Sequence, residues 1–97
     1  MEEEKELSFE WDEEKNQKNI KNHKISFSTA KFVFNDLNRI EFYDEKHSTD
    51  GEERWNVIGK VNDVLFVVYT ERSENIRLIS ARIATPKEKE VYNSQWQ

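Results

Sequence analysis

Four arginines and two histidines are the side chains of this sequence best suited to chemistry. The arginines come from one stretch that alternates predicted strands and turns: Arg54, Arg72, Arg77 and Arg82. A guanidinium group matches two phosphate oxygens at once, so such a set on one surface indicates phosphate binding. The alternative is that each arginine pairs with a nearby acid, such as Glu53 or Glu71, and only covers a sheet.

The remaining residue types exclude several kinds of site. His23 and His47 do not stand at a metal-ligand spacing such as His-x-x-x-His, so we expect no metal centre and no cofactor. The chain has no cysteine, which excludes disulfides, thiolate zinc sites and cysteine nucleophiles. Its two glycines cannot form a glycine-rich phosphate loop, and no serine has the flanking glycines of a nucleophile elbow.

The net charge of −5 is distributed unevenly along the 97 residues. Residues 1–14 carry eight acids and one base, whereas residues 15–97 carry 14 bases and 12 acids. We therefore expect a flexible acidic tail over 1–8, which is solvated or else mimics or repels phosphate, and a single domain over 9–97. The acidic start is unlike a signal peptide, and no apolar run reaches the length of about 18 residues that suggests a membrane span.

Capping signals predict where the helices begin. Asp12 is placed to cap a polar helix over 13–22, and Ser26 is placed to cap a short second helix. That second helix carries one apolar stripe: Phe27, Ala30, Val33 and Phe34. Thr85, followed by Pro86 and by Glu88, predicts a closing helix that docks on the sheet through Val91 and Tyr92.

Alternation of apolar residues predicts the strands: a short one over 8–11, a half-buried one over 39–43, and an antiparallel meander over 55–61, 64–70 and 76–83. The strand over 64–70 is apolar on both faces and should be central. The whole is an α+β domain with a short N-terminal strand, two helices, a three-stranded meander and a C-terminal helix. Arg77 and Arg82 point to opposite faces of an ideal strand, so one arginine cluster requires a bulge or bend near Ser80.

Several short blocks, in this order and spacing, resemble the BrnT family of bacterial toxins. They are Phe9-Glu10-Trp11-Asp12 with Lys15, Asn19 and His23; Ser26-Phe27 with Ala30, Val33, Phe34 and Asp36; His47-Ser48; Gly51-Glu52-Glu53-Arg54-Trp55 with Ile58-Gly59; Val67-Val68-Tyr69-Thr70-Glu71-Arg72; Ile76-Arg77; Ile79-Ser80-Ala81-Arg82; and Ala84-Thr85. The resemblance extends over residues 9 to 92.

This resemblance implies a RelE-like fold and the toxin half of a type II toxin–antitoxin pair. Such toxins are metal-independent ribonucleases that cleave RNA and arrest translation and growth in the cytoplasm. The implied partners are the RNA substrate and a cognate antitoxin of the ribbon-helix-helix type, with operator DNA bound only indirectly, through the antitoxin, and no membrane. The alternative is a decayed, non-catalytic toxin that still binds its antitoxin and helps repress the operon.

Carried over block by block, the resemblance also implies the site residues. They are His23, Lys15, Arg72, Arg77 and Arg82 for catalysis, and Arg54, His47, Ser80 and Glu53 for RNA binding. Cleavage requires a base for the ribose 2′-OH, cations around the phosphate and an acid for the leaving oxygen. His23 or His47 suits the proton transfer, with Glu53 as an alternative base. Trp11 and Trp55 either stack on bases or pack in the core.

Two residues depart from the pattern of the family. Lys24 stands where a glycine usually follows the histidine, so we expect the exit from the first helix to differ. Ile83 stands where a basic residue usually follows the Ser-Ala-Arg block, which removes one positive charge from the expected RNA surface. Weakened activity is expected from that loss.

Overall fold

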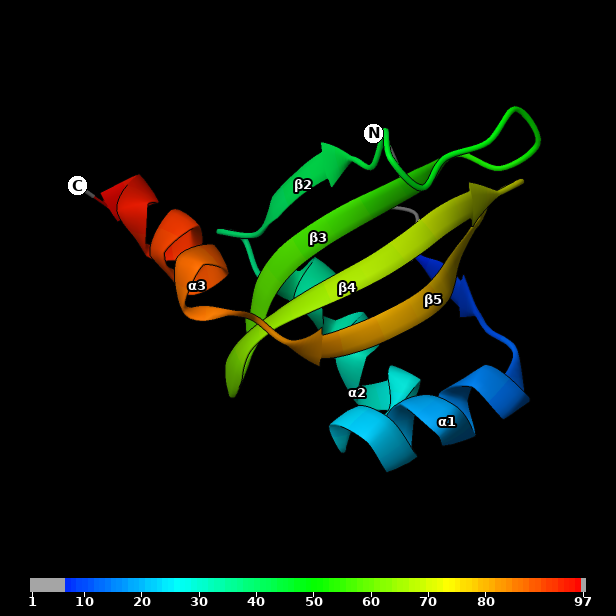
Figure 1. The fold of residues 1–97 in the computed structure, drawn as a ribbon, viewed down its shortest axis with the longest axis horizontal. Helices are drawn as coiled ribbons and strands as arrows, with labels where there is room; N and C mark the ends of the chain where they lie inside the picture. The colour runs from blue at the N-terminus through cyan, green and yellow to red at the C-terminus, as the bar shows by residue number, and fades with distance from the viewer. Residues whose placement is uncertain (1–6, 97) are drawn as a thin grey trace, which may run out of the picture.

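A five-stranded sheet is the framework of residues 7–96, which the computed structural model describes (Figure 1). The order of its strands is β1-β5-β4-β3-β2, with β1 (Ser8–Glu10), β2 (Ile40–Tyr43), β3 (Arg54–Val61), β4 (Asp63–Arg72) and β5 (Asn75–Ile83). Strands β2 to β5 are antiparallel, and β1 runs parallel to β5. The predicted three-stranded meander is therefore extended by a strand on each side. Most of the predicted acidic tail, residues 1–6, lies outside the described residues.

Strand β4 is central, as its apolar sequence predicts. It follows β3 through a tight hairpin in which Asn62 has a φ of 63°, a left-handed conformation that asparagine tolerates. Leu65 and Val67 are buried on one face of the sheet. We call this the inner face and the opposite one the outer face.

The apolar stripe predicted after Ser26 covers the inner face. It is divided between the helix α2 (Phe27–Ala30) and the 3₁₀ helix η1 (Lys31–Asn35), and α2 passes behind the strands in Figure 1. The main core joins this stripe to the sheet: Ile25, Phe27, Ala30, Val33, Phe34, Val57, Leu65, Val67, Tyr69, Leu78 and Ala81. The outer face is consequently turned away from α2 and η1.

Helix α1 (Glu13–His23) is held by hydrogen bonds rather than by an apolar stripe. The Asn19 side chain donates to the backbone carbonyls of Ile25 and Ala81, both at 2.8 Å, and accepts from the Ala81 N–H at 3.1 Å. The side-chain amide oxygen of Asn16, Oδ1, accepts from the Phe27 N–H at 2.8 Å. Both asparagines are buried, so a helix that is polar by sequence is still fixed to the edge of β5.

Lys24 leaves α1 in the conformation that a glycine would adopt. Its φ and ψ are 62° and 25°, the left-handed C-cap geometry, and its N–H donates to the Ile20 carbonyl at 2.8 Å. The expectation of a different helix exit is therefore wrong. The same turn is formed by a residue with a Cβ, at a cost in strain.

Helix α3 (Pro86–Asn93), followed by the 3₁₀ helix η2 (Ser94–Trp96), starts with the predicted capping box between Thr85 and Glu88. It covers one end of the outer face, where Tyr92 is 3% exposed. Val91 is 47% exposed, so the prediction that it docks the helix is wrong. One turn of helix presents only one of two adjacent residues to the sheet, and that residue is Tyr92.

Candidate functional site

A β-bulge brings the arginines of β5 to one face. The β4–β5 pairing shifts by one residue between Val68 and Tyr69, which leaves Ile79 without a partner in β4. An unbroken strand would turn Arg77 and Arg82 to opposite faces. Because one extra residue reverses the alternation, both now lie on the outer face. The bend required near Ser80 is therefore present.

Five residues form a line along the outer face, which we call the cross-strand row: Glu10, Arg77, Thr70 and Arg54 on four strands, and Asp44, which directly follows β2. Arg54 pairs with Thr70, Thr70 pairs with Arg77, and Arg77 pairs with Glu10. On the other side of Arg54, the Asp44 N–H donates to the Arg54 carbonyl at 2.8 Å. Neighbouring strands lie about 4.8 Å apart, so the long side chains of this row are within reach of one phosphodiester.

His47 is fixed at one end of the cross-strand row by Asp44. Its Nδ1 lies 2.9 Å from Asp44 Oδ2, and its backbone N–H donates to Asp44 Oδ1 at 3.1 Å. A carboxylate only accepts hydrogen bonds, so Nδ1 carries the hydrogen and Nε2 is left as the free nitrogen. The His47 side chain is 61% exposed. The geometry is that of a histidine oriented for proton transfer.

The environment keeps Asp44 ionised. Burial acts to raise the pKa of this carboxyl group, but the hydrogen bonds from His47 outweigh burial and hold the pKa below its ordinary value. The Asn56 side chain is a further hydrogen-bond donor to it. The anion that orients the imidazole is therefore retained at neutral pH.

Carboxylates form ion pairs with the arginines of the row and with the neighbouring Arg72. Glu10 Oε2 lies 2.8 Å from Arg77 Nη1 and 3.9 Å from Arg72 Nη1, while Arg54 Nε lies 3.0 Å from Glu52. Hydrogen bonds from Asn75 and then from Arg77 lower the pKa of Glu10. The alternative of ion pairing is thus realised, although the partners are not the predicted Glu53 and Glu71. The pairs are partly exposed, so a phosphate is able to compete for the same guanidinium groups.

Arg82 lies apart from the cross-strand row, at the end of the outer face next to α3. It donates to both carboxylate oxygens of Glu88, at 2.7 and 3.0 Å, and its guanidinium group lies 4.2 Å from the centre of the Phe66 ring. Along β4, the partners of Arg77 and Arg82 are four residues apart, which is about 13 Å. Arg82 thus ties α3 to the sheet.

The other predicted site residues are separated from the row. Lys15 and His23 are exposed on α1, and no hydrogen bond or ion pair among residues 7–96 joins their side chains to the arginines. Ser80 lies on the outer face opposite Val68. Glu53 is exposed, and its backbone carbonyl accepts from the Thr70 hydroxyl at 2.6 Å.

Sequence reasoning missed Asp44, Thr70 and Glu10 as members of the site. Of these, only Asp44 had a local signal, because an aspartate three residues before a histidine is placed to accept from it. Trp11 and Trp55, considered for base stacking, instead pack against the core, with Trp11 6.1 Å from Phe27. Ile83, expected to remove a charge from the RNA surface, pairs with Leu65, whose side chain faces inward, and therefore lies on the face opposite the cross-strand row.

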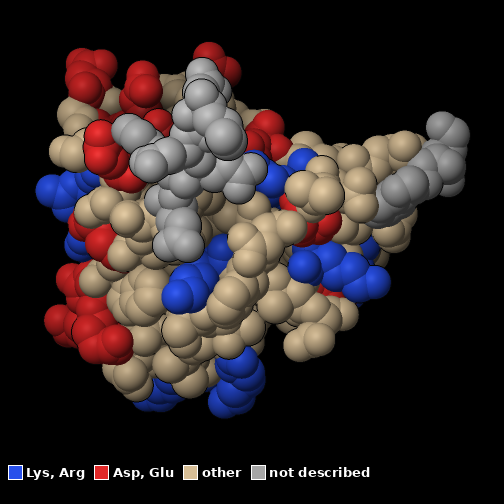
Figure 2. Space-filling model, turned by 180° about the vertical axis from the view of Figure 1, so that it is seen from behind, with Lys and Arg blue, Asp and Glu red and all other residues tan. Residues whose placement is uncertain are grey.

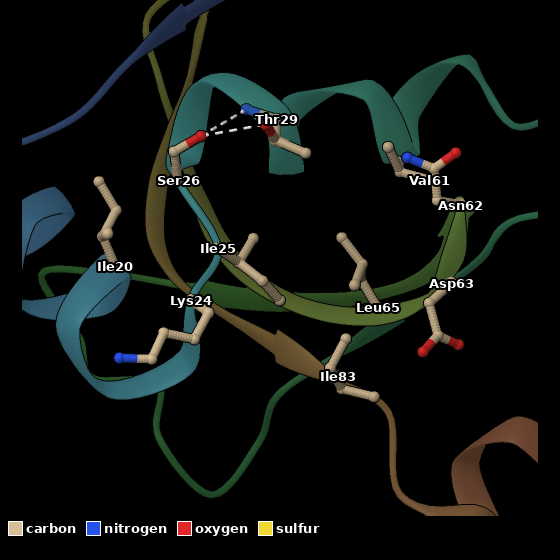
Figure 3. A pocket seen from close by; sticks show the side chains of 10 residues that line it. All are labelled: Ile20, Lys24, Ile25, Ser26, Thr29, Val61, Asn62, Asp63, Leu65 and Ile83. Carbon is tan, nitrogen blue, oxygen red and sulfur yellow. Dashed lines mark hydrogen bonds between the residues drawn. The ribbon is translucent and has the colours of Figure 1, made fainter.

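Ile83 lines a hollow of about 380 Å³ on the other side of the sheet (Figure 3). Ile20, Ile25 and Leu65 also line it, and Lys24 and Asp63 lie on opposite sides of it. Such a lining fits an apolar side chain rather than an RNA backbone. Seen from behind, acidic side chains gather along one margin and basic ones are dispersed, so the surface visible there has no single basic patch (Figure 2).

Two kinds of feature are absent from residues 7–96. Within residues 7–96, no three histidine or acidic side chains are grouped so that they could hold a metal ion. None of the helices in that part of the chain is long and apolar enough to cross a membrane.

Comparisons with known proteins agree with the fold. The sequence model described as "Ribonuclease toxin, BrnT, of type II toxin-antitoxin system" matches residues 11–88. The crystal structure of the Brucella abortus ribonuclease toxin BrnT superposes with a TM-score of 0.65 and 25% identity, covering 82% of this chain and 99% of that one. No individually curated protein sequence matches significantly. Because the matching segment spans most of the chain, the protein belongs to the BrnT family of ribonuclease toxins of type II toxin–antitoxin systems.

Proposed function

We propose that this chain is an active endoribonuclease toxin, which cleaves RNA on the cross-strand row of the outer face. The observation that carries the proposal is the placement of an oriented histidine, His47, through its contact with Asp44, at the end of the row that contains Arg54 and Arg77. Membership of a ribonuclease toxin family supports RNA as the substrate. Of the two histidines, only His47 is held at an end of the row.

In the proposed reaction, His47 Nε2 removes the proton of a ribose 2′-OH while that oxygen attacks the adjacent phosphorus. The bond from phosphorus to the 5′-oxygen breaks, and the leaving oxygen takes a proton from solvent. The products are a 2′,3′-cyclic phosphate and a 5′-hydroxyl. Arg54 and Arg77 stabilise the additional negative charge on the phosphate oxygens, a role for which preorganised cations are suited. Arg72 contacts a neighbouring phosphate.

The test is cleavage of total RNA by the purified chain at low salt with a metal chelator present. His47→Gln should lower the cleavage rate roughly 10²- to 10⁴-fold, the usual contribution of a general base. His23→Gln is the competing variant, since the family resemblance implies His23. A larger loss in His23→Gln than in His47→Gln would refute the assignment of the base to the row. Intact RNA with the folded parent protein would refute catalysis.

One observation favours a second function, a non-catalytic module that binds the antitoxin. Every arginine expected to contact phosphate has a carboxylate partner already, and the hollow beside Ile83 offers an apolar surface instead. Expression in bacteria separates the two functions. Growth arrest that is relieved by Arg77→Ala supports the ribonuclease, whereas no arrest by the folded parent supports the module.

The family implies an antitoxin partner. We propose that it is a ribbon-helix-helix protein encoded beside this chain, that the complex forms in the cytoplasm, and that operator DNA is bound through the antitoxin. Co-expression and co-purification of the neighbouring gene product test this proposal. A neighbour without a ribbon-helix-helix segment, or one that does not bind, would contradict it.

A further inference from the structure

An aromatic side chain lies on the outer face next to the cross-strand row. Phe42 of β2 is 40% exposed, although its ring contacts Phe66 with the ring centres 6.1 Å apart. Strands β2 and β4 are not neighbours, so the ring of Phe42 extends across β3 to make this contact. The two outer-face residues of β3 at this level, Asn56 and Ile58, are 6% and 2% exposed. The Phe42 ring is thus left partly open to solvent on the outer face.

Arg82 continues this aromatic surface. Its guanidinium group lies over the Phe66 ring, and two hydrogen bonds to Glu88 fix the orientation of its plane. The Arg82 side chain remains 36% exposed. The planes of the Phe42 and Phe66 rings meet at 66°, so Phe42, Phe66 and Arg82 form one contiguous cluster of π systems rather than a single plane. We call this cluster the stacking platform. Phenylalanine rings and guanidinium planes are the two kinds of surface on which proteins stack unpaired bases.

The platform adjoins the place where a phosphate would bind. Phe42 is two residues before Asp44 in sequence, a distance of about 6.6 Å along an extended strand. Phe42 pairs with Asn56, which is two residues beyond Arg54 on β3. A nucleotide whose phosphate contacts the cross-strand row therefore has its base, or the next base, over the platform.

We propose that the stacking platform binds an unpaired nucleobase of the RNA substrate, so that the site selects single-stranded over double-stranded RNA. The inference rests on the proposed ribonuclease function and adds a subsite to it. Charge favours a nucleic acid over an apolar protein segment as the occupant, because the platform contains Arg82 and shares its face of the sheet with Arg54 and Arg77. A base in a duplex has both faces covered and cannot reach the ring.

The experiment measures binding of a labelled RNA oligonucleotide with 2′-O-methyl riboses, which cannot be cleaved, by fluorescence anisotropy at low salt. Phe42→Leu retains an apolar contact with Phe66 but lacks the aromatic face. It should weaken binding of the single strand roughly tenfold or more, the usual loss for one base–aromatic stack, and leave binding of the duplex unchanged. Phe32→Leu is the matched control, because Phe32 is 49% exposed on η1, which packs on the inner face.

A second measurement does not depend on the stability of the variant. Replacing one nucleotide after another by an abasic one should weaken binding to the parent protein at one position and have no effect there on Phe42→Leu. If the parent binds no RNA, the ribonuclease function itself fails. If the parent binds RNA and Phe42→Leu binds it equally well, only the platform is refuted. Loss of antitoxin binding without loss of RNA binding in Phe42→Leu would also overturn the proposal.

Discussion

Glu10 is the carboxylate that competes most directly with RNA for two arginines of the outer face, Arg72 and Arg77. It contacts Arg77 at 2.8 Å and Arg72 at 3.9 Å. The substitution Glu10→Gln retains the size of the side chain and an oxygen that accepts from Asn75, but removes the negative charge. We expect both guanidinium groups to become available to phosphates, so that RNA binding becomes tighter and more sensitive to salt.

The change in salt sensitivity follows from the number of arginines released. For a single-stranded nucleic acid, each phosphate contact by a cationic side chain contributes about 0.7 to the slope of the logarithm of affinity against the logarithm of salt concentration. Two released arginines steepen this slope by about 1.4. Over a fourfold increase in salt, the affinity of the variant should then fall about sevenfold further than that of the parent.

The assay is a salt series of anisotropy titrations with the same uncleavable single strand. Glu14→Gln is the control, because it removes the same charge from an exposed ion pair with Lys18 on α1. Equal slopes for Glu10→Gln and the parent would refute the claim that the row binds RNA. An equal change in both variants would show an effect of net charge instead of local release. If Glu10→Gln binds more tightly but cleaves more slowly, Glu10 has an additional role in the reaction.

Three further predictions concern the fold that positions the row. Lys24→Gly relieves the left-handed backbone at the end of α1 and should raise the free energy of unfolding by about 1 kcal/mol, a rise of about 4–8 °C in Tm by circular dichroism; an unchanged Tm would contradict this. Gly59→Ala should lower the free energy of unfolding by about 1–3 kcal/mol in urea unfolding, because the added Cβ would lie 3.0 Å from Val33 Cβ. An unchanged urea midpoint would contradict this and would mean that η1 moves away to make room for the methyl group. Burial acts to raise the pKa of Asp36, but hydrogen bonds from Tyr92 and two backbone N–H groups hold it below the ordinary value. The stability that Asp36 contributes is therefore complete above about pH 4 and is lost as the pH falls through the lower, folded-state pKa. The variant Asp36→Asn should be less stable than the parent at pH 7 and should lose less stability on acidification. Parallel curves of unfolding free energy against pH for the two proteins would refute this.

The hydrogen bond from Tyr92 to Asp36 also affects the titration of the tyrosine. The contact with Asp36, together with burial as the larger cause, raises the pKa of Tyr92 to about 12. The phenol therefore remains a donor over the whole physiological range, and the link between α3 and the segment after η1 does not titrate near neutral pH.

The features that sequence alone determined depend on neighbours in the chain. Asp12, Ser26 and Thr85 each accept a hydrogen bond from a backbone N–H two or three residues later, so the starts of the helices could be predicted. The central place of β4 followed from its apolar residues on both faces. The family resemblance likewise rests on local blocks.

Tertiary structure decided which of the chemically capable residues meet. Arg77 and Arg82 share a face only because Ile79 is an additional, unpaired residue in the pairing of β5 with β4. A sequence does not show where the register between two strands shifts. Glu10 reaches Arg77 across 67 positions of sequence, and His47 rather than His23 joins the row because its loop is tied to Arg54. Strand register and long-range pairing determine which side chains are in contact, whereas side-chain type and spacing determine only which residues are chemically suited to the site.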